Sequence, residues 1–211
     1  MLVAFLSLNN NDIFSSPESR RIDSTHICDA LTKKLIANQE EVDYLKTREL
    51  NIDFCTNCRQ CMKNPGNALG TCHINDEMDV IIKSALSAKS VVLVTPINCY
   101  DLPSIVRVML ERMGVFCYWG DEMYAPKVRD VGTNVLLGVL ITTSAMPGIM
   151  VPLTTGARKS FRLFAKPLGI KKIRYYHLGF KGRKIDRSFT SKDEKKIQAV
   201  AKVICNTRRS L

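Results

Sequence analysis

Short apolar runs alternate along the chain with stretches in which apolar residues recur every three or four positions. The apolar runs cover residues 2–8, 42–45, 90–96, 134–143 and 172–177. Runs of this kind are typical of strands that are buried on both faces. The stretches with helical spacing cover residues 24–38, 76–88, 103–113, 155–167 and 191–205. The pattern therefore predicts strands that alternate with helices.

A chain of alternating strands and helices builds a parallel sheet with helices on both faces. We therefore expect one domain over residues 1–211, with a doubly wound five-stranded parallel sheet in three α/β/α layers. One domain also suits the length of the chain. Ligands of such folds bind at the carboxyl ends of the strands, so the loops that follow the strands form the candidate site.

The connecting segments give further expectations. Residues 9–23 are polar and predict a long loop, and residues 116–133 predict an irregular segment. Ser191 and Glu194 have the spacing of a capping box at the start of the last helix. Pro103 suits the first turn of the third helix, where its missing N–H has no intrahelical partner to lose.

Composition and charge narrow the class of protein. Apolar residues make up 45% of the chain and charged residues 24%, as in ordinary soluble domains, and no apolar run reaches the length of a membrane span. The apolar N-terminus is too short for a signal peptide, so we expect a cytoplasmic protein with no membrane partner. The net charge of +11 is spread along the chain without a nucleic-acid motif, which favours phosphorylated small molecules over nucleic acid as partners.

A segment over residues 53–76 holds four of the eight cysteines, namely Cys55, Cys58, Cys61 and Cys72. The C-x2-C-x2-C spacing with a more distant fourth Cys is like that of loops that ligate a [4Fe–4S] cluster. Thiolate clusters also bind zinc, and free structural thiols are a third interpretation. A cluster would make these four residues metal ligands and would imply a redox function.

A second pattern follows the third apolar run, where the chain reads Thr95-Pro-Ile-Asn-Cys-Tyr-Asp-Leu-Pro-Ser-Ile-Val-Arg-Val-Met-Leu-Glu-Arg112. It resembles, without gaps, the S-P-V-Y-x5-S/A-x-L-K-x-F-I-D-R segment of the NAD(P)H-dependent FMN reductase and iron–sulfur flavoprotein family. Residues 52–78, which contain the four cysteines and end in Asn-Asp-Glu-Met, resemble the family's I-x-P-C-x-G-C-x-x-C…C-x-x-x-D-D-M. The two matches lie in the family's order and at about its separation.

The resemblance implies a flavodoxin-like fold that binds FMN. In the family, the loop after the third strand lies against the isoalloxazine ring. Here it would place five residues at the flavin: Thr95, Pro96, Ile97, Asn98 and Cys99. Backbone N–H groups near Ile97–Cys99 and the Asn98 side chain would then donate to the ring.

Two further loops would complete the cofactor site. The family's phosphate loop is glycine-rich, whereas this chain has no glycine before Gly66; Ser24 and Thr25 at a helix start are its nearest equivalents, with simple helix capping as the alternative. After the fourth strand, Thr143, Ser144 and Gly148 occupy the position of the family's third cofactor loop. An ordinary hydroxyl-rich loop is the alternative there.

The resemblance leaves the three interpretations of the cysteines open. Ten residues separate Cys61 from Cys72, whereas the cluster-bearing members have a gap of four to seven. A loop of this length can still close at small cost. Many members of the family carry the same cysteines without a known cluster.

The sequence thus predicts an FMN-dependent oxidoreductase that moves electrons from NAD(P)H or a reduced carrier to a quinone, a small aromatic or a protein acceptor, with the [4Fe–4S] cluster as an optional relay. It predicts no acid–base catalytic residue, and the three histidines are scattered without the spacing of a triad. The resemblance also implies a homodimer or homotetramer. The alternatives are a flavodoxin-like electron carrier or interaction module that binds flavin poorly, and a zinc-stapled binding protein.

Overall fold

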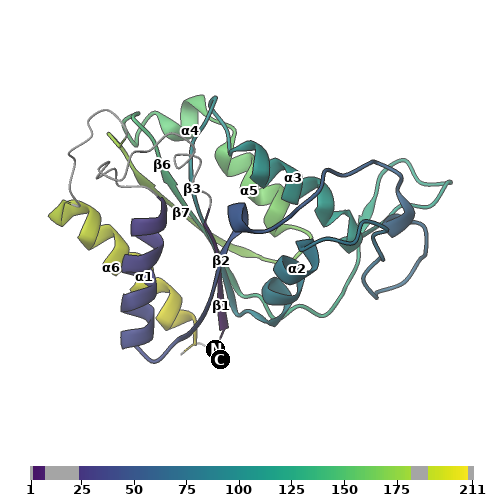
Figure 1. The fold of residues 1–211 in the computed structure, drawn as a ribbon, viewed down its shortest axis with the longest axis horizontal. Coiled ribbons are helices and arrows are strands. Elements are labelled where there is room, and N and C mark those ends of the chain that lie inside the picture. Colours follow the sequence, from purple (N-terminus) through teal and green to yellow (C-terminus); the bar gives the residue numbers. More distant parts are fainter. Residues whose placement is uncertain (1, 8–23, 182–189, 209–211) are drawn as a thin grey trace.

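A computed structural model describes residues 2–7, 24–181 and 190–208. Five strands form one parallel sheet in the order β2-β1-β3-β6-β7 (Figure 1). They are β1 (Leu2–Ser7), β2 (Glu41–Lys46), β3 (Ser90–Pro96), β6 (Leu137–Thr143) and β7 (Lys172–Leu178). Each strand that the apolar runs predict is present, and the order is that of a doubly wound, flavodoxin-like sheet.

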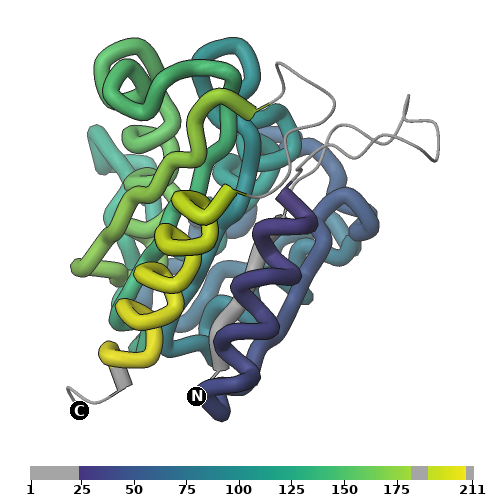
Figure 2. The backbone as a smooth tube through the Cα atoms, turned by 90° about the vertical axis from the view of Figure 1, so that its left-hand side faces the viewer, coloured from purple at the N-terminus to yellow at the C-terminus, as the bar shows by residue number. Residues whose placement is uncertain are grey.

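Helices cover both faces of the sheet. The helices α1 (Ser24–Ala37) and α6 (Ser191–Arg208) lie side by side on one face (Figure 2), and α2 (Met78–Ser87), α3 (Ser104–Arg112) and α5 (Ala157–Ala165) cover the other (Figure 1). Successive residues of β3 point to opposite faces, because Val92 and Val94 pack with α1 and α6 whereas Val91 and Leu93 pack with α2 and α3. The three-layer α/β/α architecture is therefore confirmed.

A glycine lets one helix approach the sheet closely. A Cβ atom added at Gly138 of β6 would lie 3.1 Å from Ile170 Cγ2 and 3.4 Å from the Phe161 ring. Phe161 is fully buried and stacks with Phe164 of the same helix. The small residue in the strand therefore makes room for the aromatic face of α5.

Three local predictions differ from the structure. The helix expected over residues 155–167 is the shorter α5, and a separate short helix, α4 (Val151–Thr154), lies before it, with Thr155 and Gly156 between them. The capping box of α6 is Thr190 with Asp193 instead of Ser191 with Glu194, because Asp193 N–H donates to Thr190 Oγ1 at 3.2 Å and Thr190 N–H donates to Asp193 Oδ2 at 3.1 Å. Pro103 is the N-cap of α3 and precedes its first turn.

The segment that was predicted to be irregular contains a small hairpin. After the 3₁₀ turn η3 (Met113–Phe116), strands β4 (Cys117–Tyr118) and β5 (Lys127–Val128) pair antiparallel. The cysteine segment, with the 3₁₀ turn η2 (Gln60–Met62), lies against this hairpin at the right of Figure 1, and the 3₁₀ turn η1 (Thr47–Glu49) precedes the segment. Two residues per strand are too few to give a periodic signal in the sequence.

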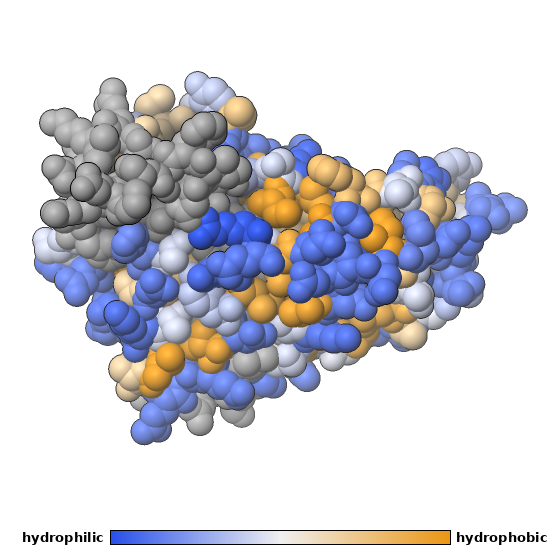
Figure 3. Space-filling view, in the orientation of Figure 1, coloured by the Kyte–Doolittle hydropathy of each residue, from blue (hydrophilic) through white to orange (hydrophobic). Residues whose placement is uncertain are grey.

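The surface shows where apolar residues gather. In the view of Figure 3 they cluster over α2 and α3, among hydrophilic residues. A cavity of about 310 Å³ lies there, between α2 and residues 69–75, and Cys72 forms part of its wall. Within the described part of the chain, no helix combines the length and apolar character needed to cross a membrane.

Candidate functional site

The loops after β3 and β6 lie next to each other at the carboxyl edge of the sheet. Ile97 N–H, just after β3, donates to the carbonyl of Thr143 at the end of β6, at 2.9 Å. The loop after β1 lies outside the described residues, which begin again at Ser24. Ser24 and Thr25 form the N-terminal end of α1, and Ser24 is buried. A helix start beside adjacent strand ends is the arrangement in which doubly wound folds bind nucleotides.

The loop after β3 makes a tight two-residue turn. Asn98 N–H donates to the carbonyl of Asp101 at 2.9 Å, and Asp101 N–H donates back to the carbonyl of Asn98 at the same distance. The central residues, Cys99 and Tyr100, have φ values of 47° and 63°. Positive φ at both positions defines the type I′ class, which strongly prefers Asn-Gly. Two side chains with a Cβ in left-handed backbone are a local strain, and such strain concentrates at functional sites.

The turn changes which backbone groups can face a ligand. The N–H groups of Ile97 and Asn98, which were expected to bond the flavin, both donate within the protein. Among the described residues, no acceptor takes the N–H groups of Cys99 and Tyr100 at the tip of the turn. Both residues are exposed. Of the three predicted donors, the N–H group of Cys99 thus stays available to a ligand, and that of Tyr100 is added to it.

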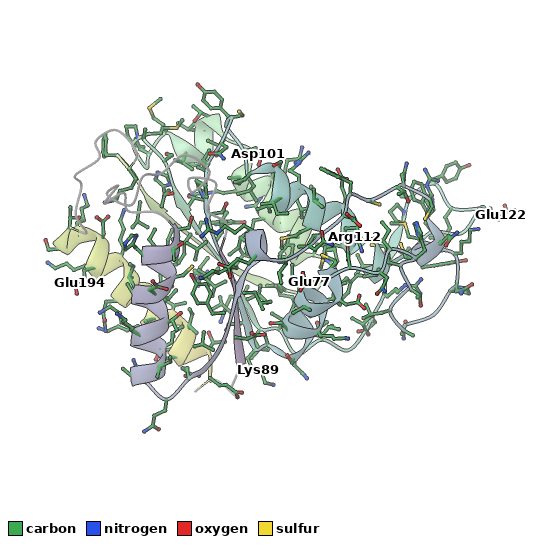
Figure 4. The ribbon with its side chains drawn as sticks, viewed as in Figure 1. Glu77, Lys89, Asp101, Arg112, Glu122 and Glu194 are labelled. Carbon is green, nitrogen blue, oxygen red and sulfur yellow. The ribbon has the colours of Figure 1, made fainter. Side chains whose placement is uncertain are left out.

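The turn is braced from behind. The Asp101 carboxylate accepts hydrogen bonds from Ser160 Oγ of α5 at 2.8 Å and from Leu102 N–H at 2.7 Å, and Gly156 N–H donates to the carbonyl of Tyr100 at 2.9 Å. Figure 4 shows Asp101 at this edge, above the start of α3. Thr95 is fully buried and its hydroxyl donates to the carbonyl of Pro96 at 3.2 Å, so these two residues shape the loop from beneath.

The loop after β6 has its own internal bonds. Thr143 is buried, and Ser144 Oγ accepts from Met146 N–H at 3.1 Å. A Cβ atom at Gly148 would lie 3.5 Å from His177 Cδ2. Two of the three predicted residues of this loop, Ser144 and Gly148, thus lie against His177, near the end of β7.

His177 is a site residue that was not predicted from the sequence. Its Nδ1 lies 2.9 Å from Thr142 Oγ1, and its Nε2 lies 3.3 Å from both Ser144 Oγ and the carbonyl oxygen of Met146. Burial lowers the pKa of the imidazole, as does nearby Lys196, although the Met146 carbonyl opposes this. A lone histidine in a strand carries no motif, so only the fold reveals this position.

The four predicted metal ligands lie in one neighbourhood. Burial raises the pKa of the Cys61 thiol, and the nearby thiols of Cys72, Cys55 and Cys58 raise it further. Cys58 Sγ lies 3.3 Å from His73 Nδ1. All eight cysteines are free. Even so, no three His, Cys, Asp or Glu side chains in the described ranges are placed to hold one metal ion.

A buried ion pair closes the cysteine segment at its two ends. Arg112 of α3 donates from Nη2 to Asp76 Oδ1 at 2.9 Å and from Nη1 to Asp76 Oδ2, and Nη1 also donates to the carbonyl of Asp53 at 2.9 Å. Figure 4 shows Arg112 at the end of α3 opposite to Asp101, close to Glu77. Burial would raise the pKa of the Asp76 carboxyl, but hydrogen bonds from Arg112 and from the N–H groups of Asp53 and Met78 hold it below its usual value.

Arg112 also bears on the fit of a cluster. Its Nε is buried and has no hydrogen-bond partner. The pKa of the guanidinium is raised, against the effect of burial, by Asp76 and by the adjacent Cys72. A buried donor without an acceptor is costly, so a negatively charged sulfur at Cys72 would fit this position.

A second buried arginine holds the middle of the cysteine segment. Arg129, just after β5, donates to four backbone carbonyls, at distances between 2.8 and 3.3 Å. They belong to Cys61, Asn64, Gly66 and Cys117. One guanidinium thus fastens the segment to the hairpin, and nothing in the sequence distinguishes it from the other basic residues.

Solved structures share this fold over nearly the whole chain. A flavone reductase has a TM-score of 0.64 at 11% identity, over 99% of this chain and 63% of that one. An NAD(P)H:quinone oxidoreductase from Methanothermobacter marburgensis has a TM-score of 0.63 at 14% identity, over 97% of both chains. An FMN-dependent NADH-azoreductase from Bacillus anthracis in complex with FMN has a TM-score of 0.61 at 9% identity, over 97% of this chain and 99% of that one.

These likenesses confirm the expected flavodoxin-like fold. This chain spans less than two thirds of the length of the flavone reductase but nearly all of the other two structures. The sequence itself matches no family model and no curated protein. What the three proteins bind and reduce therefore bears on this chain only as support for a proposal.

Proposed function

We propose that this protein is an FMN-dependent oxidoreductase of the NAD(P)H-dependent FMN reductase family, which reduces a quinone or another small aromatic acceptor. The observation that carries the proposal is the strained turn at Cys99–Tyr100, which offers two N–H donors at the carboxyl edge of a flavodoxin-like sheet. FMN, when bound, supplies the redox chemistry, and the protein supplies orientation and electrostatics. The structural neighbours, a flavone reductase, an NAD(P)H:quinone oxidoreductase and an FMN-dependent NADH-azoreductase, support this class of reaction.

Each loop has a proposed role. The N–H groups of Cys99 and Tyr100 would hydrogen-bond the polar edge of the ring, where donors favour the negative charge of the reduced form. Ser24 and Thr25 at the start of α1 would bind the phosphate. The loop from Thr143 to Gly148 would form the remaining wall. No acid or base is assigned, since these residues bind and orient the cofactor.

Exposed apolar side chains near the same edge suit a flat apolar acceptor. Ile149 is 79% exposed and Leu153 of α4 is 82% exposed, and Tyr100 at the turn is 65% exposed. Large exposed apolar patches mark binding sites or subunit contacts. The proposal therefore includes a homodimer or homotetramer, which light scattering on the purified protein tests.

The cysteine segment is assigned no step in this reaction. The orphaned Nε of Arg112 fits a negatively charged sulfur, but the described side chains form no set that holds a single metal ion. A [4Fe–4S] cluster on Cys55, Cys58, Cys61 and Cys72 thus stays a prediction. Iron and sulfide counts on anaerobically purified protein test it, and zinc without iron would favour the zinc-stapled alternative.

The test of the function is a flavin titration followed by turnover. FMN added to the purified protein is expected to bind with quenching of its fluorescence, and NAD(P)H is expected to reduce a soluble quinone steadily. A protein that binds no FMN contradicts the proposal. Binding without steady turnover favours the electron-carrier alternative.

Two variants of the turn make this test specific. Replacement of Cys99-Tyr100 by Asn-Gly keeps the type I′ turn and its N–H groups, so FMN affinity is expected to stay within about twofold while left-handed strain is relieved by about 1 kcal/mol. Tyr100→Pro removes one N–H and cannot adopt a φ of 63°, so FMN binding is expected to be lost. Equal FMN affinity in both variants would show that the turn does not contact the ring.

A further inference from the structure

His177 sits where three segments of the carboxyl edge meet. It is near the end of β7, and its ring contacts the end of β6 at Thr142 and the following loop at Ser144 and Met146. Its backbone carbonyl accepts a hydrogen bond from Lys196 Nζ of α6 at 2.6 Å. The histidine therefore connects the helix on one face of the sheet to the loop that is proposed to hold the flavin.

The contacts define the form of the ring. The carbonyl oxygen of Met146 can only accept, so Nε2 must carry the hydrogen. Nδ1 then accepts from the hydroxyl of Thr142 at 2.9 Å. Burial lowers the pKa of the ring from its usual value, which favours the neutral form. The result is a fixed Nε2–H donor aimed at the loop.

The loop has a second attachment at the same place. Ser144 N–H donates to the carbonyl of Leu178 at 3.4 Å, and Lys181 N–H donates to the carbonyl of Ser144 at 2.9 Å. The Lys181 ammonium in turn pairs with the Asp193 carboxylate at 2.6 Å. These bonds fix Ser144, whereas Met146 is held by the imidazole, by the Ser144 hydroxyl and by Thr154 Oγ1, which donates to Met146 Sδ at 3.2 Å.

We propose that His177 is a positioning residue for the cofactor loop: its Nε2–H holds the carbonyl of Met146 and the hydroxyl of Ser144, and so presents Thr143 to Gly148 in the shape that binds FMN. This inference rests on the proposed function. It adds a residue that touches the loop from behind and is not expected to touch the cofactor.

Matched substitutions separate the donor from the bulk of the ring. His177→Gln places an amide N–H close to the position of Nε2, whereas His177→Asn keeps a polar group only near Nδ1. We expect FMN affinity close to that of the wild type for His177→Gln. For His177→Asn we expect a loss of about threefold to tenfold, the range for one lost hydrogen bond.

A second readout does not need the cofactor. Amide hydrogen exchange of residues 142–150 in the flavin-free protein is expected to be about threefold to tenfold faster in His177→Asn and unchanged in His177→Gln. Nitrogen NMR of the wild-type imidazole is expected to show the Nε2–H tautomer.

The outcomes are distinct. If both variants exchange and bind like the wild type, or if both lose equally, the Nε2–H donor does not position the loop and the proposal is wrong. An Nδ1–H tautomer would overturn it as well. If the wild type binds no FMN, the proposed function fails, and exchange and tautomer still decide whether His177 positions the loop.

Discussion

At the scale of single residues, we expect the ion pair of Asp76 and Arg112 to contribute most to the stability of the cysteine segment. Their side chains are 1% and 3% exposed, so both charges have left water and depend on each other. The carboxylate also accepts from the N–H groups of Asp53 and Met78. One ion pair thereby joins the start of the cysteine segment, its end and the helix α3.

Loss of that carboxylate should be costly. Asp76→Asn leaves the Arg112 guanidinium buried without its counter-charge, and we expect the free energy of unfolding to fall by about 3–5 kcal/mol in urea titrations. Asp79→Asn, at an exposed position in the first turn of α2, is the control and is expected to stay within about 0.5 kcal/mol of the wild type. Equal stability of the two variants would show that the pair is not needed.

The pH dependence of stability follows from the shifted pKa values of Asp76, Asp193 and His177. The folded pKa values of Asp76 and Asp193 are depressed, so their contribution is complete above the unfolded value of about 4 and is lost as pH falls below it. The His177 pKa is depressed too, which adds a loss of stability that begins as pH falls below about 6.5. Thermal unfolding between pH 7.5 and 3 should show both phases, and His177→Gln should lack only the first. A wild type with no change between pH 7 and 5 would contradict this assignment.

At the scale of elements, one glycine lets the cysteine segment fold back on itself. A Cβ atom at Gly70 would lie 1.7 Å from the carbonyl oxygen of Cys61, a backbone atom that Arg129 also holds. Gly70 N–H donates to the carbonyl of Val115 at 2.8 Å, which fixes the segment to η3. The backbone at residue 70 lies so close to the backbone at Cys61 that no side chain fits between them.

Gly70→Ala should therefore dislodge the segment. We expect a loss of about 2–4 kcal/mol of unfolding free energy, in the range of overpacked sites, and faster amide exchange over residues 55–75. Thr71→Ala, at the exposed next position, is expected to change neither quantity. Equal stability and equal amide exchange of the two variants would mean that the close contact at Gly70 does not hold the segment in place.

The elements that can be predicted from the sequence are those long enough to show an apolar run or a helical spacing of apolar residues. The five apolar runs correspond to the five strands of the sheet, and the amphipathic stretch at residues 24–38 corresponds to α1, because burial of one helix face imposes a period on the sequence. The hairpin of β4 and β5 has two residues per strand and so no period. The capping box of α6 moved by one residue because Thr190 and Asp193 have the same spacing as Ser191 and Glu194, and only Asp193 also pairs with Lys181.

At the scale of the whole molecule, the net charge of +11 should act on the cofactors. FMN and NAD(P)H are anions, and a positive surface field attracts them over distances of about a Debye length. We expect FMN affinity to fall severalfold between about 20 and 300 mM salt. Riboflavin, which lacks the phosphate, is the matched control and should show little change. The same salt effect on both ligands would point to the protein itself responding to salt.

The candidate site was predictable in outline only. The order of strands and helices predicts that the loops after β3 and β6 meet, and the bond from Ile97 to Thr143 shows that they do. Which N–H groups point outward depends on the turn at Cys99–Tyr100, whose positive φ values run against the preference of both residues. His177 reaches the site only through the pairing of β7 with β6, a contact between distant parts of the chain.

Arg129 binds the cysteine segment through carbonyl oxygens alone, and every amino acid carries that atom. The backbone conformation of this segment therefore depends largely on a residue outside it, Arg129, which lies more than fifty residues downstream. Cysteines can therefore be lost or gained in this segment during evolution while its backbone conformation stays the same. The cysteine side chains are then not needed for the backbone conformation of the segment. Single Cys→Ser variants should therefore remain folded, so that the role of each thiol can be measured.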